Sequence, residues 1–130
     1  MKKYSLITGA SSGIGRAIAI QLSKKNNVII SGSKFHELKK TKSLCSKLNK
    51  HLIWQNDFTN IENLQSDFEN FIKKEKIFID NFIHSAGIAE VKLFRLFNLS
   101  EINKTVNINF LSASIIAKSL IKKINKKKLK

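Results

Sequence analysis

The stretch Thr8-Gly9-Ala10-Ser11-Ser12-Gly13-Ile14-Gly15 decides how this chain is expected to fold. It ends a short apolar run, Lys3–Thr8, and it leads into apolar residues at helical spacing: Ile14, Ala17, Ile18 and Leu22. This order predicts a strand, a glycine-rich turn and a helix. A helix that begins at such a turn presents unpaired backbone N–H groups and the positive end of its dipole at one point. The stretch therefore predicts a pyrophosphate-binding site.

The three glycines of this turn are expected to have different tasks. Gly9 permits the sharp turn, Gly13 lets phosphates approach the backbone, and Gly15 lets the helix pack closely on the strand, because a Cβ atom would obstruct each. The serine hydroxyls can add donors. Six residues of the turn are thus predicted to contact the ligand: Gly9, Ser11, Ser12, Gly13, Ile14 and Gly15.

Short apolar segments and amphipathic helices alternate along the rest of the chain. Further strands are predicted over 28–32, 51–55 and 78–84. Helices are predicted from a stripe of Leu38, Cys45 and Leu48, from a stripe of Ile61, Leu64, Phe68, Phe71 and Ile72, and from Ser100 to Lys123. This alternation predicts one α/β domain: a Rossmann-like doubly wound parallel sheet of about four strands in the order 3-2-1-4, with flanking helices.

Composition limits the classes of partner. The 130 residues are 42% hydrophobic and carry a net charge of +15, which comes almost entirely from lysine, since Arg16 and Arg95 are the two arginines. Sequence-reading nucleic-acid sites use arginine forks and aromatic platforms, and neither pattern is present. We therefore do not expect nucleic acid to be the main partner. Binding of nucleic acid through the lysine charge is an alternative function.

Location and metal binding are also constrained by the sequence. Tyr4–Ile7 is too short for the core of a signal peptide, and no apolar run exceeds the four residues 17–20. These features predict a cytoplasmic protein without a membrane segment. Cys45 is the single cysteine, and the three histidines lack metal-ligand spacing, so neither an internal disulfide nor a metal site is expected.

Several motifs together resemble one family. The run Thr8–Gly15, followed by Arg16-Ala17, resembles the cofactor fingerprint of the short-chain dehydrogenase/reductase family. Asp57-Phe58-Thr59 resembles the aspartate-led turn of that family, and Ser85-Ala86-Gly87 resembles its Asn-Asn-Ala-Gly segment. Asn109 corresponds to the asparagine of the family's catalytic tetrad. The resemblance implies an oxidoreductase that transfers a hydride between a nicotinamide dinucleotide and a carbonyl or alcohol.

The resemblance also implies roles for single residues. Asp57 would accept a hydrogen bond from the adenine amino group, Ala86 and Gly87 would let the strand end pass beside the cofactor, and Asn109 would anchor a proton-relay water. From the residues alone, Asp57 can instead be a turn-forming acid and Asn109 a helix-surface amide. His84 departs from the family, because it stands with Ser85 where two asparagines tie the fourth strand to its neighbours.

The end of the second predicted strand bears on the choice of cofactor. An acidic residue there would bind the ribose 2′-hydroxyl of NAD, but the sequence reads Ser31-Gly32-Ser33-Lys34. Ser33 and Lys34 suit a 2′-phosphate, with the lysine acting as a point charge. NADP is therefore favoured, and NAD is the alternative.

The family's catalytic serine and Tyr-x-x-x-Lys motif are absent, and Tyr4 is the single tyrosine. The resemblance implies that residues 1–130 form an NAD(P)-binding domain that is incomplete at its C-terminus, inactive alone, with 120–130 as a loop. The alternative is a non-catalytic dinucleotide-binding or interaction module. In an incomplete domain the fourth strand would be an uncovered edge, and this edge and the helix 100–123 are expected to recruit a second copy or a complementary chain.

Overall fold

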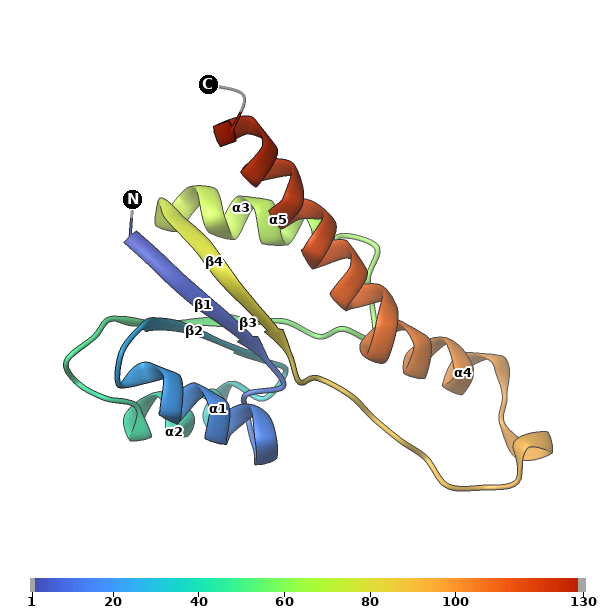
Figure 1. Ribbon diagram of the computed structural model, residues 1–130. Helices are drawn as coiled ribbons and strands as arrows, with labels where there is room; N and C mark the ends of the chain where they lie inside the picture. Colours follow the sequence, from blue (N-terminus) through green and yellow to red (C-terminus); the bar gives the residue numbers. More distant parts are fainter. Residues whose placement is uncertain (1, 129–130) are drawn as a thin grey trace. The chain divides into compact units, whose positions relative to one another are not determined.

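The computed structural model describes residues 2–128, with side chains described up to residue 123. The elements in chain order are β1 (Lys2–Thr8), α1 (Gly13–Ser23), β2 (Asn27–Gly32), α2 (Phe35–Leu44), β3 (His51–Gln55), α3 (Leu64–Glu75), β4 (Ile77–His84), a 3-10 turn (Phe94–Leu96), α4 (Leu99–Val106), a π-helical segment (Asn107–Leu111) and α5 (Ser112–Lys128) (Figure 1). The chain divides into two compact units. The first unit contains the residues up to Asp57 together with Phe71–Ala86, and the second contains Phe58–Asn70 and the residues from Gly87 onward.

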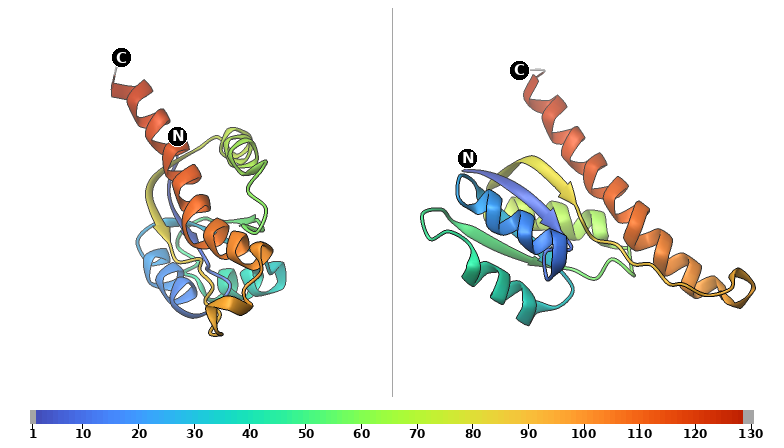
Figure 2. Two further views of the ribbon diagram at one scale, coloured as in Figure 1. Left: turned by 90° about the vertical axis from the view of Figure 1, so that its right-hand side faces the viewer. Right: turned by 60° about the horizontal axis from the view of Figure 1, so that its bottom comes forward.

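The first unit contains a four-stranded parallel sheet in the order β3-β2-β1-β4 (Figure 2). The predicted strand order is therefore confirmed. The two central strands carry fully buried apolar residues, among them Leu6, Ile7, Ile29 and Ile30, as expected for strands that have neighbours on both sides. Among the described residues, β4 pairs on one side only, so it forms an edge of the sheet.

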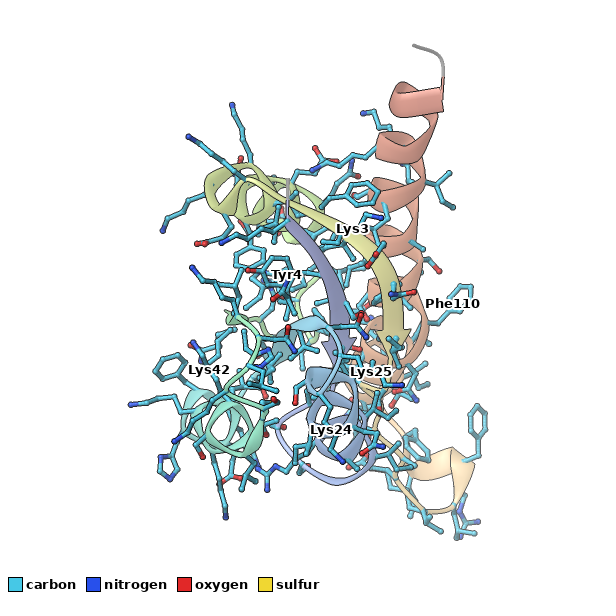
Figure 3. All side chains as sticks on the ribbon, turned by 60° about the vertical axis from the view of Figure 1, so that its left-hand side comes forward. Lys3, Tyr4, Lys24, Lys25, Lys42 and Phe110 are labelled. Atoms are coloured by element: carbon cyan, nitrogen blue, oxygen red, sulfur yellow. The ribbon has the colours of Figure 1, made fainter. Side chains whose placement is uncertain are left out.

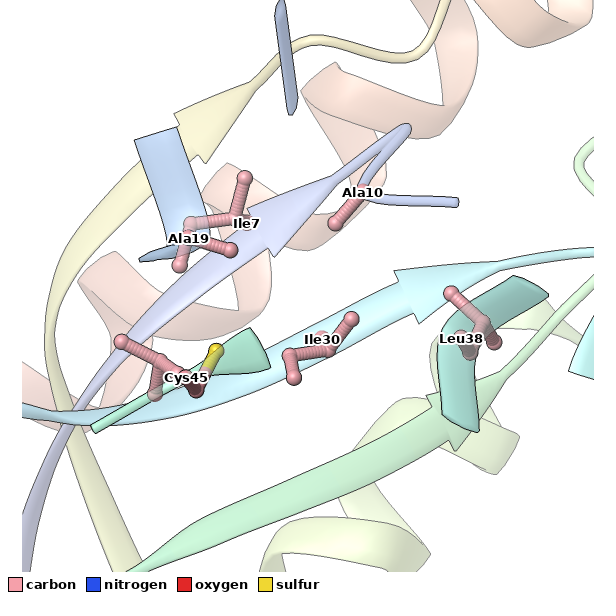
Figure 4. Packing of buried hydrophobic residues seen from close by; sticks show 7 residues of the cluster. Ile7, Ala10, Ala19, Ile30, Leu38 and Cys45 are labelled. Carbon is pink, nitrogen blue, oxygen red and sulfur yellow. The ribbon is translucent and has the colours of Figure 1, made fainter. Parts of the chain in front are cut away.

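One apolar cluster packs α1 and α2 onto the sheet (Figure 4); it consists of Ile7, Ala10, Ala19, Val28, Ile30, Leu38 and Cys45. One prediction about this layer is wrong. Leu48 is 89% exposed, because α2 ends at Leu44 and the backbone then becomes extended at Cys45. Ile14, a predicted ligand contact, is 76% exposed, and the buried residues of α1 are small: Gly15, Ala19 and Ser23.

The helix α3 buries residues four positions apart: Leu64, Phe68 and Ile72. The predicted apolar stripe is confirmed for these three positions, whereas Ile61 precedes the helix. Phe71 stacks on Trp54 of β3 with 5.9 Å between the ring centroids. The strongest helical pattern of the sequence thus marks a helix with a buried face.

The second unit contains α4, the π-helical segment and α5, where one helix from Ser100 was predicted. The helix begins earlier, because Asn98 is the N-cap and forms a capping box with Glu101. The regular pattern breaks where the N–H of Ser112 bonds the carbonyl of Asn107, five residues back. The prediction of a loop over 120–130 is wrong for its described part, since α5 continues to Lys128. Within residues 2–128, no helix is long and apolar enough to cross a membrane.

Candidate cofactor site

The turn after β1 depends on a close approach between two strand ends of the first unit. Gly9 has φ +64°, and a Cβ atom placed there would lie 2.6 Å from the backbone of both Ser85 and Ala86. A side chain would therefore be strained by the backbone conformation and would also collide with main-chain atoms that cannot move independently. Gly9 accordingly lets the end of β4 lie directly against the turn.

Gly13 and Gly15 differ in what surrounds them. A Cβ atom on Gly15 would lie 2.6 Å from the carbonyl carbon of Gly9, so this glycine allows α1 to lie against the turn. Gly13 has φ +53°, and a Cβ atom placed on it would meet nothing within 4 Å, so the space beside it is open. Ser12 is the N-cap residue, and its side chain makes no capping hydrogen bond. The first amides of α1 thus border open space and have no partners within the helix.

A buried hydroxyl joins β1 to the end of β4. Thr8 is fully buried, and its Oγ1 lies 2.9 Å from Nδ1 of His84. The same oxygen accepts hydrogen bonds from the backbone N–H groups of Ser85, at 3.2 Å, and Ala86, at 3.3 Å. Since those two amides donate to it, the hydroxyl hydrogen of Thr8 can donate to the histidine ring. His84 thus takes part in a hydrogen-bonded link between β4 and β1, although it departs from the asparagine that the family has at this position.

The ends of β2 and β3 carry the other predicted contacts of the first unit. Ser33 and Lys34 are exposed, and Lys34 is the N-cap of α2, without a capping hydrogen bond from its side chain. Asp57 is exposed and follows Asn56, whose N–H donates to the carbonyl of Gly32 at 2.9 Å. Since the carboxyl ends of parallel strands lie at one edge of the sheet, all these residues border the edge where such folds bind ligands.

The lysines of this unit lie mostly on its surface. Lys24, Lys25 and Lys42 are exposed, as Figure 3 illustrates, whereas the single tyrosine, Tyr4, is 4% exposed within β1. Within the described residues, no three histidine, cysteine or acidic side chains gather into a group that could hold a metal ion. The groups that the first unit exposes include hydroxyls, lysine ammonium groups and the carboxylate of Asp57.

Asn109 and Gly87 belong to the second unit. Asn109 Oδ1 accepts a hydrogen bond from the N–H of Ile88 at 2.8 Å, and Asn109 Nδ2 donates to the carbonyl of Ile88, also at 2.8 Å. A Cβ atom on Gly87 would lie 3.5 Å from Asn109 Oδ1, which is ordinary contact. The amide of Asn109 is therefore occupied in holding the segment after β4, a role that the sequence did not reveal.

A hollow of about 370 Å³ is lined by residues of this segment and of α4: Ile88, Ala89, Glu90, Glu101, Lys104 and Thr105. Glu101 pairs with Lys92 at 2.6 Å. The hydrogen bond from Lys92, together with the backbone N–H of Asn98, lowers the pKa of the Glu101 carboxyl. This carboxylate is thus engaged in capping α4 and in the ion pair.

A parallel sheet with a glycine turn between its first strand and first helix defines a nucleotide-binding type of α/β protein. The family model for short chain dehydrogenases matches residues 3–129, and the chain belongs to this family. A 3-oxoacyl-[acyl-carrier-protein] reductase FabG of Rickettsia prowazekii is 36% identical, over 97% of this chain and 50% of the relative. A benzil reductase of Bacillus cereus is 30% identical, over 92% and 50%.

Solved structures agree with this fold. An alcohol dehydrogenase from Comamonas testosteroni matches with a TM-score of 0.81 and 22% identity, over 98% of this chain and 51% of that structure. A metagenomic short-chain oxidoreductase in complex with NADP matches with a TM-score of 0.82 and 16% identity, over 92% and 55%. The chain thus spans about half the length of the relatives that it matches.

Proposed function

We propose that this chain is the dinucleotide-binding part of an NAD(P)-dependent short-chain oxidoreductase. The observation that carries the proposal is the open space beside Gly13 at the first amides of α1, which have no partners within the helix. A pyrophosphate fits there because backbone donors and the helix dipole both favour an anion. Cocrystallisation or NMR titration of the purified chain with each dinucleotide tests this. Shifts of the turn signals support the proposal, and unchanged turn signals contradict it.

The proposed contacts follow the order of the cofactor's parts. The pyrophosphate would lie on the turn, with Ser11 and Ser12 adding hydroxyl donors. Asp57 would accept a hydrogen bond from the adenine amino group, and Ala86 and Gly87, which follow β4, would flank the cofactor. The bound nicotinamide ring would supply the hydride chemistry of the complete protein. An Asp57→Asn variant tests the adenine contact, since it should weaken binding of ADP-ribose as well as of whole dinucleotides.

We favour NADP over NAD. Ser33 and Lys34 are exposed at the end of β2, where a hydroxyl and a cation would meet a 2′-phosphate. Among the structural neighbours, a Burkholderia cenocepacia dehydrogenase is, like the metagenomic one, described in complex with NADP. Lys34→Ala is expected to weaken NADPH binding about tenfold and to leave NADH binding unchanged. Tighter binding of NADH by the unaltered chain would reverse the assignment.

Hydride transfer is proposed for the complete protein and not for these residues alone. Tyr4 is buried in β1 and cannot serve as an acid/base, and Asn109 is proposed to position the segment at Ile88. NADPH oxidation by the chain alone should stay at background. The relatives named for 3-oxoacyl-[acyl-carrier-protein] reduction make 3-oxoacyl thioesters the first substrates to try. Measured turnover would contradict inactivity, and dinucleotide binding without turnover in any assembled form would favour a non-catalytic module.

We also propose, in line with a cytoplasmic location, that the chain works with another polypeptide surface. In the first unit β4 pairs on one side only, and in the second unit the apolar residues Leu99, Ile102 and Val106 along α4 are exposed. Light scattering over a concentration series tests for a second copy. A monomer at all concentrations excludes self-association and leaves a complementary chain as the proposed partner.

A further inference from the structure

Two carbonyl groups of the glycine turn accept hydrogen bonds from side chains of α1 and α2. The hydroxyl of Thr41, which is fully buried, donates to the carbonyl of Ala10 at 2.7 Å. Nη2 of Arg16 donates to the carbonyl of Ser11. The carbonyl groups of Ala10 and Ser11 therefore both accept hydrogen bonds from protein side chains, and neither is left to face an anion.

The side chains that supply these donors are bonded to one another. Nε of Arg16 donates to Oγ1 of Thr41 at 2.9 Å, and its Nη2 lies 2.5 Å from Oε2 of Glu37. A guanidinium that makes several directed bonds is held in one orientation, which an ammonium would not be. The hydrogen bond from Arg16 lowers the pKa of the Glu37 carboxyl, so the pair stays charged at neutral pH. We call Arg16, Glu37 and Thr41 the turn clamp.

The turn clamp fixes the direction of two amides. In a trans peptide, the carbonyl of one residue and the N–H of the next point in opposite directions within one plane, and the described chain has no cis peptide. Holding the carbonyls of Ala10 and Ser11 therefore aims the N–H groups of Ser11 and Ser12 away from the clamp. Preorganised donors bind an anion more tightly than donors that must first be ordered.

We propose that the turn clamp consists of positioning residues, which hold the glycine turn in its phosphate-binding conformation without touching the cofactor. This inference rests on the proposed dinucleotide function. It predicts that losing the clamp weakens NADPH and NADH by the same factor, because the two cofactors share the pyrophosphate. A residue that touched the 2′-phosphate would instead affect NADPH alone.

Thr41→Val removes the hydroxyl at nearly constant volume, and Thr41→Ser restores it. Titrations of both folded variants with NADPH and NADH should give about tenfold weaker binding for the valine variant and near-normal binding for the serine variant. Glu101→Gln, which alters the ion pair of the second unit, is the matched control and should leave both affinities unchanged. Amide hydrogen exchange at Ala10, whose N–H donates to the carbonyl of Ser31 at 3.0 Å, should be faster in Thr41→Val without any ligand.

The outcomes separate the two proposals. If the unaltered chain binds neither dinucleotide, the proposed function is overturned, and the clamp's role in binding falls with it. If the unaltered chain binds but Thr41→Val binds equally well, or loses NADPH alone, the positioning role is overturned by itself. Should Thr41→Val fail to fold, Arg16→Lys gives the same test, since it keeps the charge and loses the fork; equal weakening for both cofactors supports the clamp.

Discussion

The two units of the chain differ in how far their large apolar side chains are buried. In the first unit, Leu6, Ile7, Ile29 and Ile30 are fully buried, and exposed ones such as Ile14 are isolated. In the second unit, exposed apolar residues follow one another over 91–110, including Phe94 at 82% and Phe110 at 65%. Runs of exposed apolar residues on a folded protein mark surfaces that contact something else. The first unit therefore supplies its own core, whereas the second depends more on what covers it.

The largest effect is expected where the first unit is most crowded. Gly15→Val would place a β-branched side chain against the backbone of Gly9, so we expect a loss of about 5 kcal/mol or more, enough to unfold the chain. Gly13→Ala is the control, because a Cβ atom at this position meets open space. It should lower the free energy of unfolding by about 1 to 2 kcal/mol, since the backbone there has a positive φ. Urea unfolding measures both. Equal losses would mean that the turn is not packed as described.

The next largest effect on stability is expected at a buried aromatic residue of the second unit. Phe68 is fully buried, so Phe68→Ala should lower the free energy of unfolding by about 3 to 5 kcal/mol through lost burial and a cavity. Thermal or urea unfolding gives the value. A loss below about 1 kcal/mol would show that the second unit packs loosely throughout and not only at its surface.

The hydroxyl tie in the first unit should have an intermediate effect. Thr8→Val leaves two backbone N–H groups and the His84 ring without their buried partner, which should cost about 2 to 3 kcal/mol. Thr8→Ser keeps the hydroxyl and should recover most of this loss. If valine and serine variants unfold at the same urea concentration, the hydrogen bonds to Thr8 contribute nothing to stability.

A smaller effect is expected on the pH dependence of stability, for one carboxylate in each unit. Hydrogen bonds from Arg16 and Lys92 lower the pKa values of Glu37 and Glu101, respectively. A carboxyl group whose pKa is lower in the folded state than in the unfolded state stabilises the fold at pH values above its unfolded pKa of about 4.3. This stabilisation is lost as the pH falls through the folded pKa. Urea midpoints between pH 7 and pH 2.5 should therefore change less in Glu37→Gln and in Glu101→Gln. An unchanged profile in either variant would contradict its lowered pKa.

The smallest effect on stability is expected at the exposed surface of the second unit. Phe110→Ser should change the free energy of unfolding by no more than about 0.5 kcal/mol, because the ring is already in solvent. It should nevertheless reduce any self-association seen by light scattering. A loss of more than about 2 kcal/mol in a monomer would mean that the ring is covered in solution, and the contrast between the units would then disappear.

Much of the fold and part of the candidate site could be predicted from the sequence. The strand order and the packing task of Gly15 follow from local signals, namely strand and helix periodicity and a turn that glycine alone tolerates. Local signals were less reliable at helix ends, where Asn98 and not Ser100 caps α4 and Leu48 falls beyond α2. Capping depends on a few hydrogen bonds, so periodicity locates a helix better than its limits.

The sequence by itself determined the class of sheet and the position of the glycine turn, because these depend on residues close together in the chain. The tertiary structure alone decided which side chains hold the turn and the strand ends. Arg16 meets Glu37 across 21 positions, Thr8 meets His84 across 76, and Asn109 meets Ile88 across 21. Partners so far apart leave no periodic pattern, since their meeting depends on how whole strands and helices pack.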